Sequence, residues 1–258
     1  MKSTLKFLAI IPVFAFLLHS CSSDDDSSPM GAPVISNFEY GQGSAHTTDR
    51  VAYKGSDIHM EAEITAGAGV GSITVSIHAH DLAPGEGEVE WGLEQHFTDA
   101  KYLVINPTFH EHFDVPTDIP AGEYHIEFTV TDTLGNSTEV EGHIQILDPV
   151  VLEGLSLDGS VVRGNDLHAE FTVRAVHGIH SITVDIHAHG IEPAAGEVAW
   201  EHLQVFGDPY HGQPEAVFHE HIDVPATAPA GEYHIIITVE DEQGNTKSHG
   251  THIDVTKA

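Results

Sequence analysis

Histidine pairs separated by a single residue are the pattern in this sequence with the clearest chemistry. The chain has 22 histidines among 258 residues. In a β-strand, residues i and i+2 point to the same face with their Cα atoms about 7 Å apart, so both imidazoles can reach one ion. A third histidine from a neighbouring strand would complete a site of the kind that holds zinc in proteins. The pairs are His78 and His80, His110 and His112, His187 and His189, and His219 and His221.

The single cysteine and the net charge narrow this chemistry further. Cys21 is the only cysteine, so neither a thiolate metal site nor an internal disulfide is available. Imidazole ligands without thiolate suit Zn²⁺, Cu²⁺ or Ni²⁺, and zinc is favoured because it tolerates tetrahedral sites. The formal net charge of −31 repels nucleic acid and attracts cations. The sequence therefore predicts a divalent metal ion, and no nucleic acid, as a partner.

An internal duplication sets the domain organisation. The segment 55–59 returns as 164–168, and the segment 72–80 returns as 181–189. These pairs share one offset of 109 residues, which needs no gap from Gly55 to the end of the sequence. Repeats of this kind indicate two copies of one structural unit. The predicted domains are 33–148 and 149–258, joined at Asp148-Pro149.

Each copy has the pattern of an all-β domain. Apolar and polar residues alternate over short stretches, which is typical of strands with one buried face. About 110 residues with some seven short strands is the size of an immunoglobulin-like β-sandwich. We therefore expect two tandem immunoglobulin-like β-sandwich domains. In the first copy, strands are predicted over 33–40, 57–65, 72–80, 107–115, 123–131 and 139–147.

Several conspicuous residues have structural explanations. A tyrosine that follows Pro-Ala-Gly-Glu, just before an alternating strand, is expected at a corner of the sandwich. An aspartate that opens an Asp-x-x-Gly-Asn run is expected to hold a turn. A tryptophan between strands is expected to anchor a loop. These residues are Tyr124 and Tyr233, Asp132 and Asp241, and Trp91 and Trp200, respectively.

Strand alternation places the histidines of each copy toward one end of the sandwich and on its outer faces. Ile73, Val75 and Ile77 occupy the core side of their strand, so His78 and His80 point outward together. Neighbouring strands of the same sheet present further histidines on that face. A metal site is therefore predicted on this face in both copies. Its residues are His78, His80, His125 and, within reach, His143 in the first copy, and His187, His189, His234 and His252 in the second.

The other sheet is expected to carry a second histidine group, with carboxylates as extra oxygen ligands. One alternative stays open, because the segment 81–108 is long enough for another strand. The pair at 110 and 112 would then lie beside the strand 72–80, and both pairs would form one four-histidine site. The residues of the second group are His59, His110 and His112 with Glu61 or Asp114, and His168, His219 and His221 with Glu170 or Asp223.

The N-terminal residues have the pattern of an exported lipoprotein. Two lysines precede an uncharged apolar run over 7–18, which is too short to span a bilayer but typical of a signal peptide. Cys21 follows where cleavage is expected, as in the bacterial lipobox, and would then be lipidated. We predict a signal peptide over 1–20, an acylated acidic tether over 21–32, and anchoring in the outer membrane, exposed at the cell surface.

This leader, followed by tandem sandwich domains with His-x-His pairs, resembles an uncharacterised family of Bacteroidota surface lipoproteins. The resemblance implies fold and location and supplies no function. From the residues, the leading hypothesis is a non-enzymatic protein that captures, buffers or transfers a divalent metal, with a membrane transporter as one candidate recipient. The alternative is a glycan- or protein-binding adhesin module whose histidines are structural or titrate with pH. A metallohydrolase is not expected, because alternation points Glu111 and Glu220 away from the flanking imidazoles.

The junction between the copies carries one more hypothesis. The first copy ends at its histidine-bearing end, and the second should begin at the opposite end of its own sandwich. The loop 174–180 of the second copy contains His177 and His180, whereas the corresponding loop 65–71 contains no histidine. These two residues are therefore expected to approach the histidines of the first domain.

Overall fold

The structure is a computed structural model that describes residues 31–257. The predicted signal peptide, Cys21 and the tether up to residue 30 lie outside the described residues. Within residues 31–257, no helix combines the length and the apolar character needed to cross a membrane.

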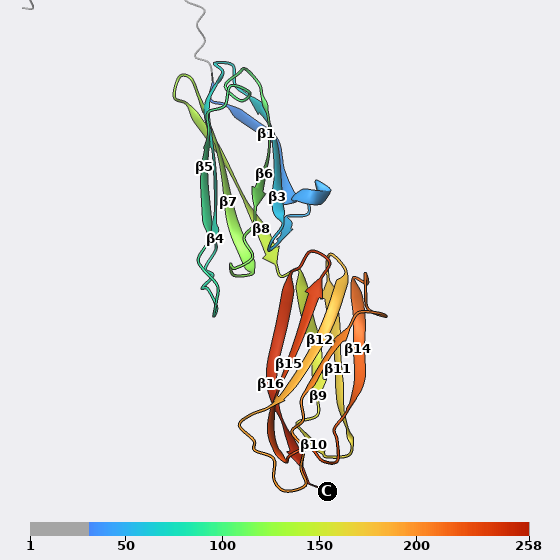
Figure 1. Cartoon of the computed structure of the whole chain (residues 1–258). Helices are drawn as coiled ribbons and strands as arrows, with labels where there is room; N and C mark the ends of the chain where they lie inside the picture. The colour runs from blue at the N-terminus through green and yellow to red at the C-terminus, as the bar shows by residue number, and fades with distance from the viewer. Residues whose placement is uncertain (1–30, 258) are drawn as a thin grey trace, which may run out of the picture.

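The first domain is a sandwich of a three-stranded and a five-stranded sheet. Figure 1 shows β1, β3 and β6 in one layer and β4, β5, β7 and β8 in the other. The strand orders are β1-β3-β6 and β2-β8-β7-β4-β5. All pairings are antiparallel except β2 with β8. The elements are β1 (Val34–Gln42), the 3₁₀ helix η1 (Gly43–Ala45), β2 (Val51–Tyr53), β3 (Asp57–Thr65), β4 (Val70–Ala79), β5 (Gly92–Phe97), β6 (Thr108–Asp114), β7 (Gly122–Asp132) and β8 (Ser137–Leu147).

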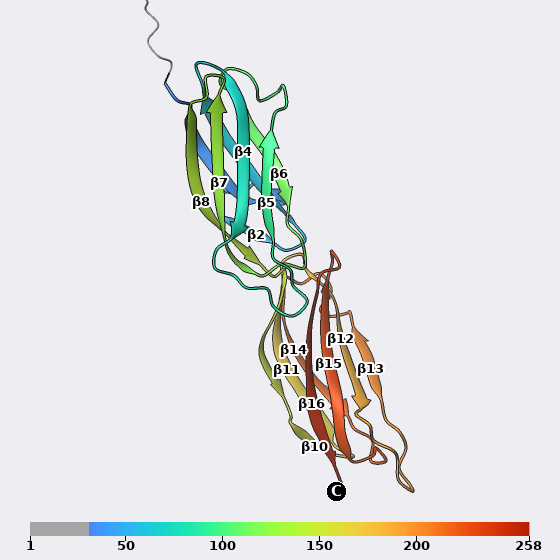
Figure 2. The ribbon, with the colours of Figure 1, turned by 90° about the vertical axis from the view of Figure 1, so that its left-hand side faces the viewer.

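The second domain repeats this arrangement, with strand orders β9-β11-β14 and β10-β16-β15-β12-β13. Figure 2 shows corresponding strands of the two five-stranded sheets in the same order. Its elements are β9 (Val150–Leu157), β10 (Ser160–Val162), β11 (Asp166–Ala175), β12 (Ile179–Ala188), β13 (His202–Phe206), β14 (Glu215–Asp223), β15 (Gly231–Asp241) and β16 (Thr246–Thr256). The all-β class and the tandem sandwich architecture are confirmed.

All six strands expected in the first copy are present, with ends that differ by at most a few residues. The segment 81–108 does contain an additional strand, β5, which pairs with β4. The histidine pair of β6 instead pairs with β3. The two His-x-His pairs of the first domain therefore lie in different sheets, and the alternative of one four-histidine site formed by both pairs is wrong.

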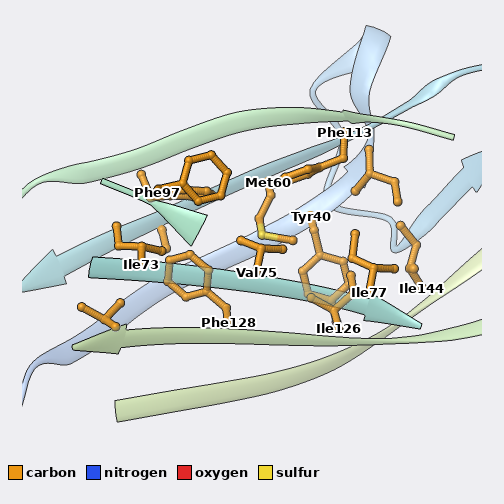
Figure 3. Close-up of a cluster of buried hydrophobic side chains, with 14 of the residues drawn as sticks. Tyr40, Met60, Ile73, Val75, Ile77, Phe97, Phe113, Ile126, Phe128 and Ile144 are labelled. Carbon is orange, nitrogen blue, oxygen red and sulfur yellow. The ribbon is translucent and has the colours of Figure 1, made fainter. Parts of the chain in front are cut away.

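Alternating apolar residues from both sheets form the core of the first domain. Met60 and Phe113 of the three-stranded sheet and Val75 and Ile126 of the five-stranded sheet are buried in one cluster, which Figure 3 shows between the two layers. Burial of apolar area is the main stabilising contribution to such a sandwich. The intervening polar residues, including the histidines, must then lie on the outer faces.

The residues expected to have structural roles have them. The hydroxyl of Tyr124 donates to the carbonyl of Pro120 at 2.9 Å, and Tyr233 makes the same bond to Pro229 at 3.0 Å. These are the corner contacts of immunoglobulin-like domains. The ring of Trp91 packs 5.4 Å from that of Tyr124 between ring centres, so Trp91 anchors its loop to the core.

The second copy has the same anchor in Trp200, 5.2 Å from Tyr233. Asp132 and Asp241 each hold a turn: the carboxylate of Asp132 accepts bonds from the backbone of Leu134 and Asn136 at 2.9 and 2.8 Å.

The two sandwiches lie end to end (Figure 1). Asp148 joins them: its carboxylate is 2.9 Å from Nζ of Lys54 in the first domain and 3.2 Å from Nζ of Lys247 in the second. The backbone N–H of Val176 donates to the carbonyl of Pro149 at 2.9 Å. The loop 174–180 of the second domain therefore does lie against the linker, at the end of the first domain where β8 finishes.

Candidate metal centre

Four histidine rings of the first domain form one mutually packed cluster on the outer face of the three-stranded sheet. His59 of β3 lies directly opposite His112 of β6, and Glu61 lies opposite His110. The rings of His59, His110 and His112 are 5.1 to 5.5 Å apart between centres. This grouping agrees with the prediction for the second histidine group. A fourth ring, that of His46, lies 4.8 Å from the ring of His59, 5.6 Å from that of His110 and 5.0 Å from that of His112, between centres.

The spacing of these rings is the spacing that a tetrahedral ion requires. If one nitrogen of each ring stood about 2.05 Å from a shared zinc ion, the four ring centres would lie about 5.2 Å apart. All six distances in the cluster fall between 4.8 and 5.6 Å. One nitrogen from each ring lies within 4.8 Å of the other three. A modest closing of the side chains would therefore bring four ring nitrogens onto one metal.

The loop 43–50 brings His46 to the sheet. It begins with η1, which projects beside β3 (Figure 1). His46 ends this 3₁₀ turn in the left-handed conformation, with φ 48° and ψ 46°, and its N–H donates to Gly43. A left-handed residue reverses the chain direction sharply, and histidine is among the residues that tolerate it. This reversal positions the ring over the histidines of β3 and β6.

Asp57 holds two parts of the cluster in place by hydrogen bonds. Its Oδ2 lies 2.6 Å from Nδ1 of His112, and its Oδ1 accepts a hydrogen bond from the hydroxyl of Ser44 at 3.4 Å. A carboxylate that binds one ring nitrogen fixes the ring orientation and leaves the other nitrogen free to bind a metal. Asp57 thus orients one ligand directly and holds the loop that carries another.

His59 lies at the base of the cluster and is only 2 % exposed. Burial, followed by the nearby rings of His46, His110 and His112, lowers the pKa of His59. Its Nδ1 is buried and has no hydrogen-bond partner among the described residues. A buried, unpaired imidazole nitrogen is costly to leave unsatisfied. A metal ion would both satisfy such a nitrogen and favour the neutral form that the low pKa already provides.

The second domain has a three-histidine version of this cluster. The rings of His168, His219 and His221 lie 4.9 to 5.5 Å apart between centres, and their nitrogens also lie within 4.8 Å of one another. Asp166 accepts a hydrogen bond from Nδ1 of His221, which lowers the pKa of Asp166. The counterpart of the His46 loop is reduced to residues 158 and 159, between β9 and β10. This short loop therefore supplies no fourth histidine to the site.

The histidines of the other outer face are arranged as a row. His78, His125 and His143 lie directly opposite one another on β4, β7 and β8, with neighbouring rings 5.1 Å apart. His125 lies between the other two in this row. The possible ligands group differently from the prediction: His78 and His125 lie with Glu127, whereas the ring of His80 lies 5.6 Å from that of His143.

The corresponding row in the second domain is His187, His234 and His252. Here the ring of His189 stacks on that of His252 at 5.3 Å, and Glu232 joins these two as a possible ligand. Each outer face can thus supply two histidines and a carboxylate to one ion. This is a smaller donor set than that of the four-histidine cluster.

The carboxylates expected as extra ligands differ in their positions. Glu170 lies 3.6 Å from Nε2 of His168 and 4.0 Å from Nδ1 of His219, so it can join the second-domain site. Glu61 lies near enough to His59 to act on its pKa. In these two clusters, the aspartates that contact a histidine ring are Asp57 and Asp166, rather than Asp114 and Asp223.

Sequence reasoning missed His46, Asp57 and Asp166. The two aspartates did have a signal, because Asp-x-His recurs at Asp57-Ile58-His59 and Asp166-Leu167-His168. An aspartate two residues before a strand histidine lies on the same face. His46 had no such signal, because its loop is absent from the second copy.

The fold and these clusters define a tandem β-sandwich protein with a histidine group on each outer face. The chain belongs to the family described as a domain of unknown function, DUF4625, which matches residues 19–147 and again residues 150–256. No curated protein matches the chain.

Three solved structures illustrate the similarity of the fold. A bacterial ice-binding adhesin is 12 % identical with a TM-score of 0.35, over 88 % of this chain and 66 % of that one. A tandem repeat from the extending region of a large adhesion protein is 11 % identical with a TM-score of 0.30, over 87 % and 50 %. The C-terminal domain of the AgI/II polypeptide BspA of Streptococcus agalactiae is 11 % identical with a TM-score of 0.39, over 79 % and 94 %. These similarities are too distant to inform function.

Proposed function

We propose that this chain is a non-enzymatic protein that binds a divalent transition metal, with zinc favoured over Cu²⁺ and Ni²⁺, for capture, buffering or transfer. The main observation in support is the four-histidine cluster, in which every ring centre lies 4.8 to 5.6 Å from every other. The cluster consists of His46, His59, His110 and His112. Four imidazoles and no thiolate form a donor set suited to these metals. The net charge of −31 raises the local concentration of cations around it.

The difference between the two copies supports a role in holding and exchanging metal. Closed sites with four protein ligands are typical of tightly held zinc, whereas sites with three ligands keep a position for water or another donor. The first-domain cluster would offer four histidines to an ion, and the second-domain cluster would offer three. An open position allows an incoming ligand to associate before the ion leaves, which is what transfer to a recipient such as a membrane transporter requires.

A hydrolytic role has weaker support, because Glu111, which lies between the two histidines of β6, is already engaged. Oε1 of Glu111 accepts hydrogen bonds from the hydroxyl of Tyr102 at 2.6 Å and from Nζ of Lys101 at 2.5 Å. Although burial opposes it, these bonds lower the pKa of Glu111. A general base needs a pKa near the working pH and reach to the bound water. Glu111 meets neither requirement, so binding is the function that these residues support.

The location of the protein is part of the proposal. The apolar run over 7–18 followed by Cys21 supports export and lipid anchoring in the outer membrane, in the manner of Bacteroidota surface lipoproteins. An anchored, acidic metal-binding protein would concentrate the ion at the cell surface. Labelling with radioactive palmitate tests this part separately: label should be incorporated into the expressed full-length chain and lost in Cys21→Ala.

Metal stoichiometry tests the proposal itself. The chain should be purified without a histidine tag, loaded with zinc at pH 7.5 and dialysed against buffer of low free zinc. Because the four-histidine site is closed, about one ion or more per chain should remain bound. Retention of fewer than about one ion per two chains would contradict the proposal.

The second candidate is a glycan- or protein-binding adhesin module, which one surface feature favours. Leu203 and Val205 on the edge strand β13 are 71 % and 61 % exposed, and an open strand edge can pair with a strand of another protein. The corresponding residues of the first copy are the polar Glu94 and His96. Binding of a partner that persists undiminished in chelator, and is lost in Leu203→Lys, would favour this function over metal binding.

A further inference from the structure

A third kind of histidine group lies at the end of the second domain that faces the first. His180, His211 and Glu242 place one ligand atom each within 4.8 Å of one another. Nδ1 of His180 is 3.6 Å from Oε2 of Glu242, and Nε2 of His211 is 3.3 Å from Oε1 of the same carboxylate. All three side chains are exposed, so an ion from solution can reach them.

Three separate elements supply these residues, and backbone hydrogen bonds tie the elements together. His180 lies at the start of β12, His211 in the loop 207–214, and Glu242 in the turn between β15 and β16. The N–H of Gly212 donates to the carbonyl of Ile179 at 2.8 Å, and the N–H of Glu242 donates to that of Gly178 at 3.0 Å. The backbones are thus held in place, and only side-chain rotation is needed to close the group.

The distances within the group fit a coordinated ion. Nitrogen and oxygen ligands at about 2.0 to 2.1 Å from a tetrahedral zinc ion stand about 3.3 to 3.4 Å from one another. The histidine-to-carboxylate distances, 3.3 Å to Oε1 and 3.6 Å to Oε2, are close to that value. Because they involve different oxygens, a side chain must rotate before both nitrogens can share an ion with one oxygen of Glu242. The rings of His180 and His211 are 5.7 Å apart between centres. Two histidines, a carboxylate and one water would complete a four-coordinate site.

This group belongs to the second copy alone. The positions that correspond to His180 and Glu242 are Gly71 and Thr133. The position that corresponds to His211 is Leu103. Each of these residues directly follows a tyrosine, and the two tyrosines pack on equivalent core residues: Tyr102 on Phe109 and Tyr210 on Phe218. None of the three first-copy residues has an imidazole or a carboxylate in its side chain. The three residues therefore occur together only in the copy in which this end of the sandwich faces the other domain.

The turn that carries Glu242 also forms the contact between the domains. The carboxylate of Asp241 holds this turn by accepting bonds from the backbone of Gln243 and Asn245 at 2.9 and 2.8 Å. Lys247, just beyond it, pairs with Asp148, which also pairs with Lys54 of the first domain. Residues of this turn and of the first domain line one hollow at the junction. A restraint on the turn would therefore act on residues that line the junction with the first domain.

We propose that His180, His211 and Glu242 bind a divalent transition-metal ion, and that the bound ion restrains the β15–β16 turn and thereby the junction of the two domains. This differs from the expectation that His177 and His180 would lie with the histidines of the first domain. His180 is grouped with ligands of its own domain instead. The site is separate from the four-histidine cluster, so either can exist without the other.

Hydrogen exchange of the full chain at pH 7.5 tests this proposal, with zinc alone as the probe. A conformation in which the ligands have moved apart cannot bind the ion. Zinc should therefore raise the protection of these amides against exchange by a factor of one plus the ratio of free zinc concentration to the dissociation constant. At free zinc ten times that constant, amides of 207–214 and 242–247 should exchange about tenfold more slowly. This slowing should vanish in Glu242→Gln and in His180→Ala.

Two further outcomes complete the test. His46→Asn, which alters the four-histidine cluster, should leave the zinc-dependent slowing at 207–214 and 242–247 unchanged, and this separates failure here from failure of the proposed function. The proposal is overturned if zinc does not slow exchange in these segments, or if Glu242→Gln retains the slowing. It is also overturned if the slowing disappears in His46→Asn, because the effect would then originate in the first domain.

Discussion

Replacing His46 by asparagine should separate metal binding from folding in the first domain. Asparagine tolerates the left-handed conformation that His46 adopts, with φ 48°, so the loop should keep its path. The substitution removes the ligand that makes the first-domain site closed, and leaves His59, His110 and His112 in an arrangement like that of the second domain. The variant should therefore bind zinc at the first domain more weakly while its apo form is unaltered.

The magnitude follows from the geometry. Loss of a second-layer partner costs 10- to 100-fold in affinity, so loss of a direct ligand should cost at least about 100-fold. By linkage, a 100-fold weaker affinity removes about 2.7 kcal/mol of zinc-dependent stability. About 1 kcal/mol shifts the melting temperature of a domain of this size by roughly 4 °C, so the zinc-bound transition should fall by about 10 °C. The apo transition should move by less than about 2 °C, because a change in an exposed loop costs within about 0.5 kcal/mol.

Chelator competition and differential scanning calorimetry measure these two quantities on the full chain. His96→Asn is the matched control, because His96 is an exposed histidine of β5 that hydrogen-bonds Thr74 rather than a member of the cluster. The control should keep both the affinity and the zinc-dependent shift. If His46→Asn binds zinc as tightly as the wild type, the four rings do not form one site, and the inference from their spacing is wrong.

The remaining predictions concern pH, the second layer and the corner. Burial lowers the pKa of His59, so the unfolded chain takes up the proton first, and the stability of the apo protein should fall as pH drops through about 6.5. Protons also compete with the metal for the imidazoles. Calorimetry should therefore show that zinc raises the melting temperature at pH 7.5 but hardly at pH 5. Asp57→Asn should weaken zinc binding by about 10- to 100-fold in chelator competition, and Asp166→Asn should do the same at the second domain only. Tyr124→Phe should lower the free energy of unfolding by about 1 kcal/mol in urea denaturation, with the zinc stoichiometry unchanged.

The fold could be predicted from the sequence because it depends on local patterns that occur twice. Period-2 alternation in β4 and β7 determines which side chains enter the core, and the same alternation puts His78 and His125 on the outer face. His59, His110 and His112 could be grouped for the same reason, since β3 and β6 had to pair within one sheet. Each of these inferences needs only strand direction and face.

The rest of the candidate site depends on geometry that alternation does not determine. The register of β4, β7 and β8 sets His78, His125 and His143 in a straight row, and register depends on turn geometry as well as pattern. His46 lies in a loop with no periodicity, and a single left-handed residue decides where its ring points. His211 likewise reaches Glu242 only through the path of a long loop.

Anomalous diffraction at the zinc edge, from crystals of the tag-free chain grown with zinc near pH 7.5, tests the central claim most directly. A peak should lie among His46, His59, His110 and His112, about 2.0 to 2.1 Å from one nitrogen of each ring. Data collected on both sides of the edge would identify the element. A well-ordered first domain with no anomalous density among these four rings, at zinc concentrations that load other histidines of the chain, would contradict the account.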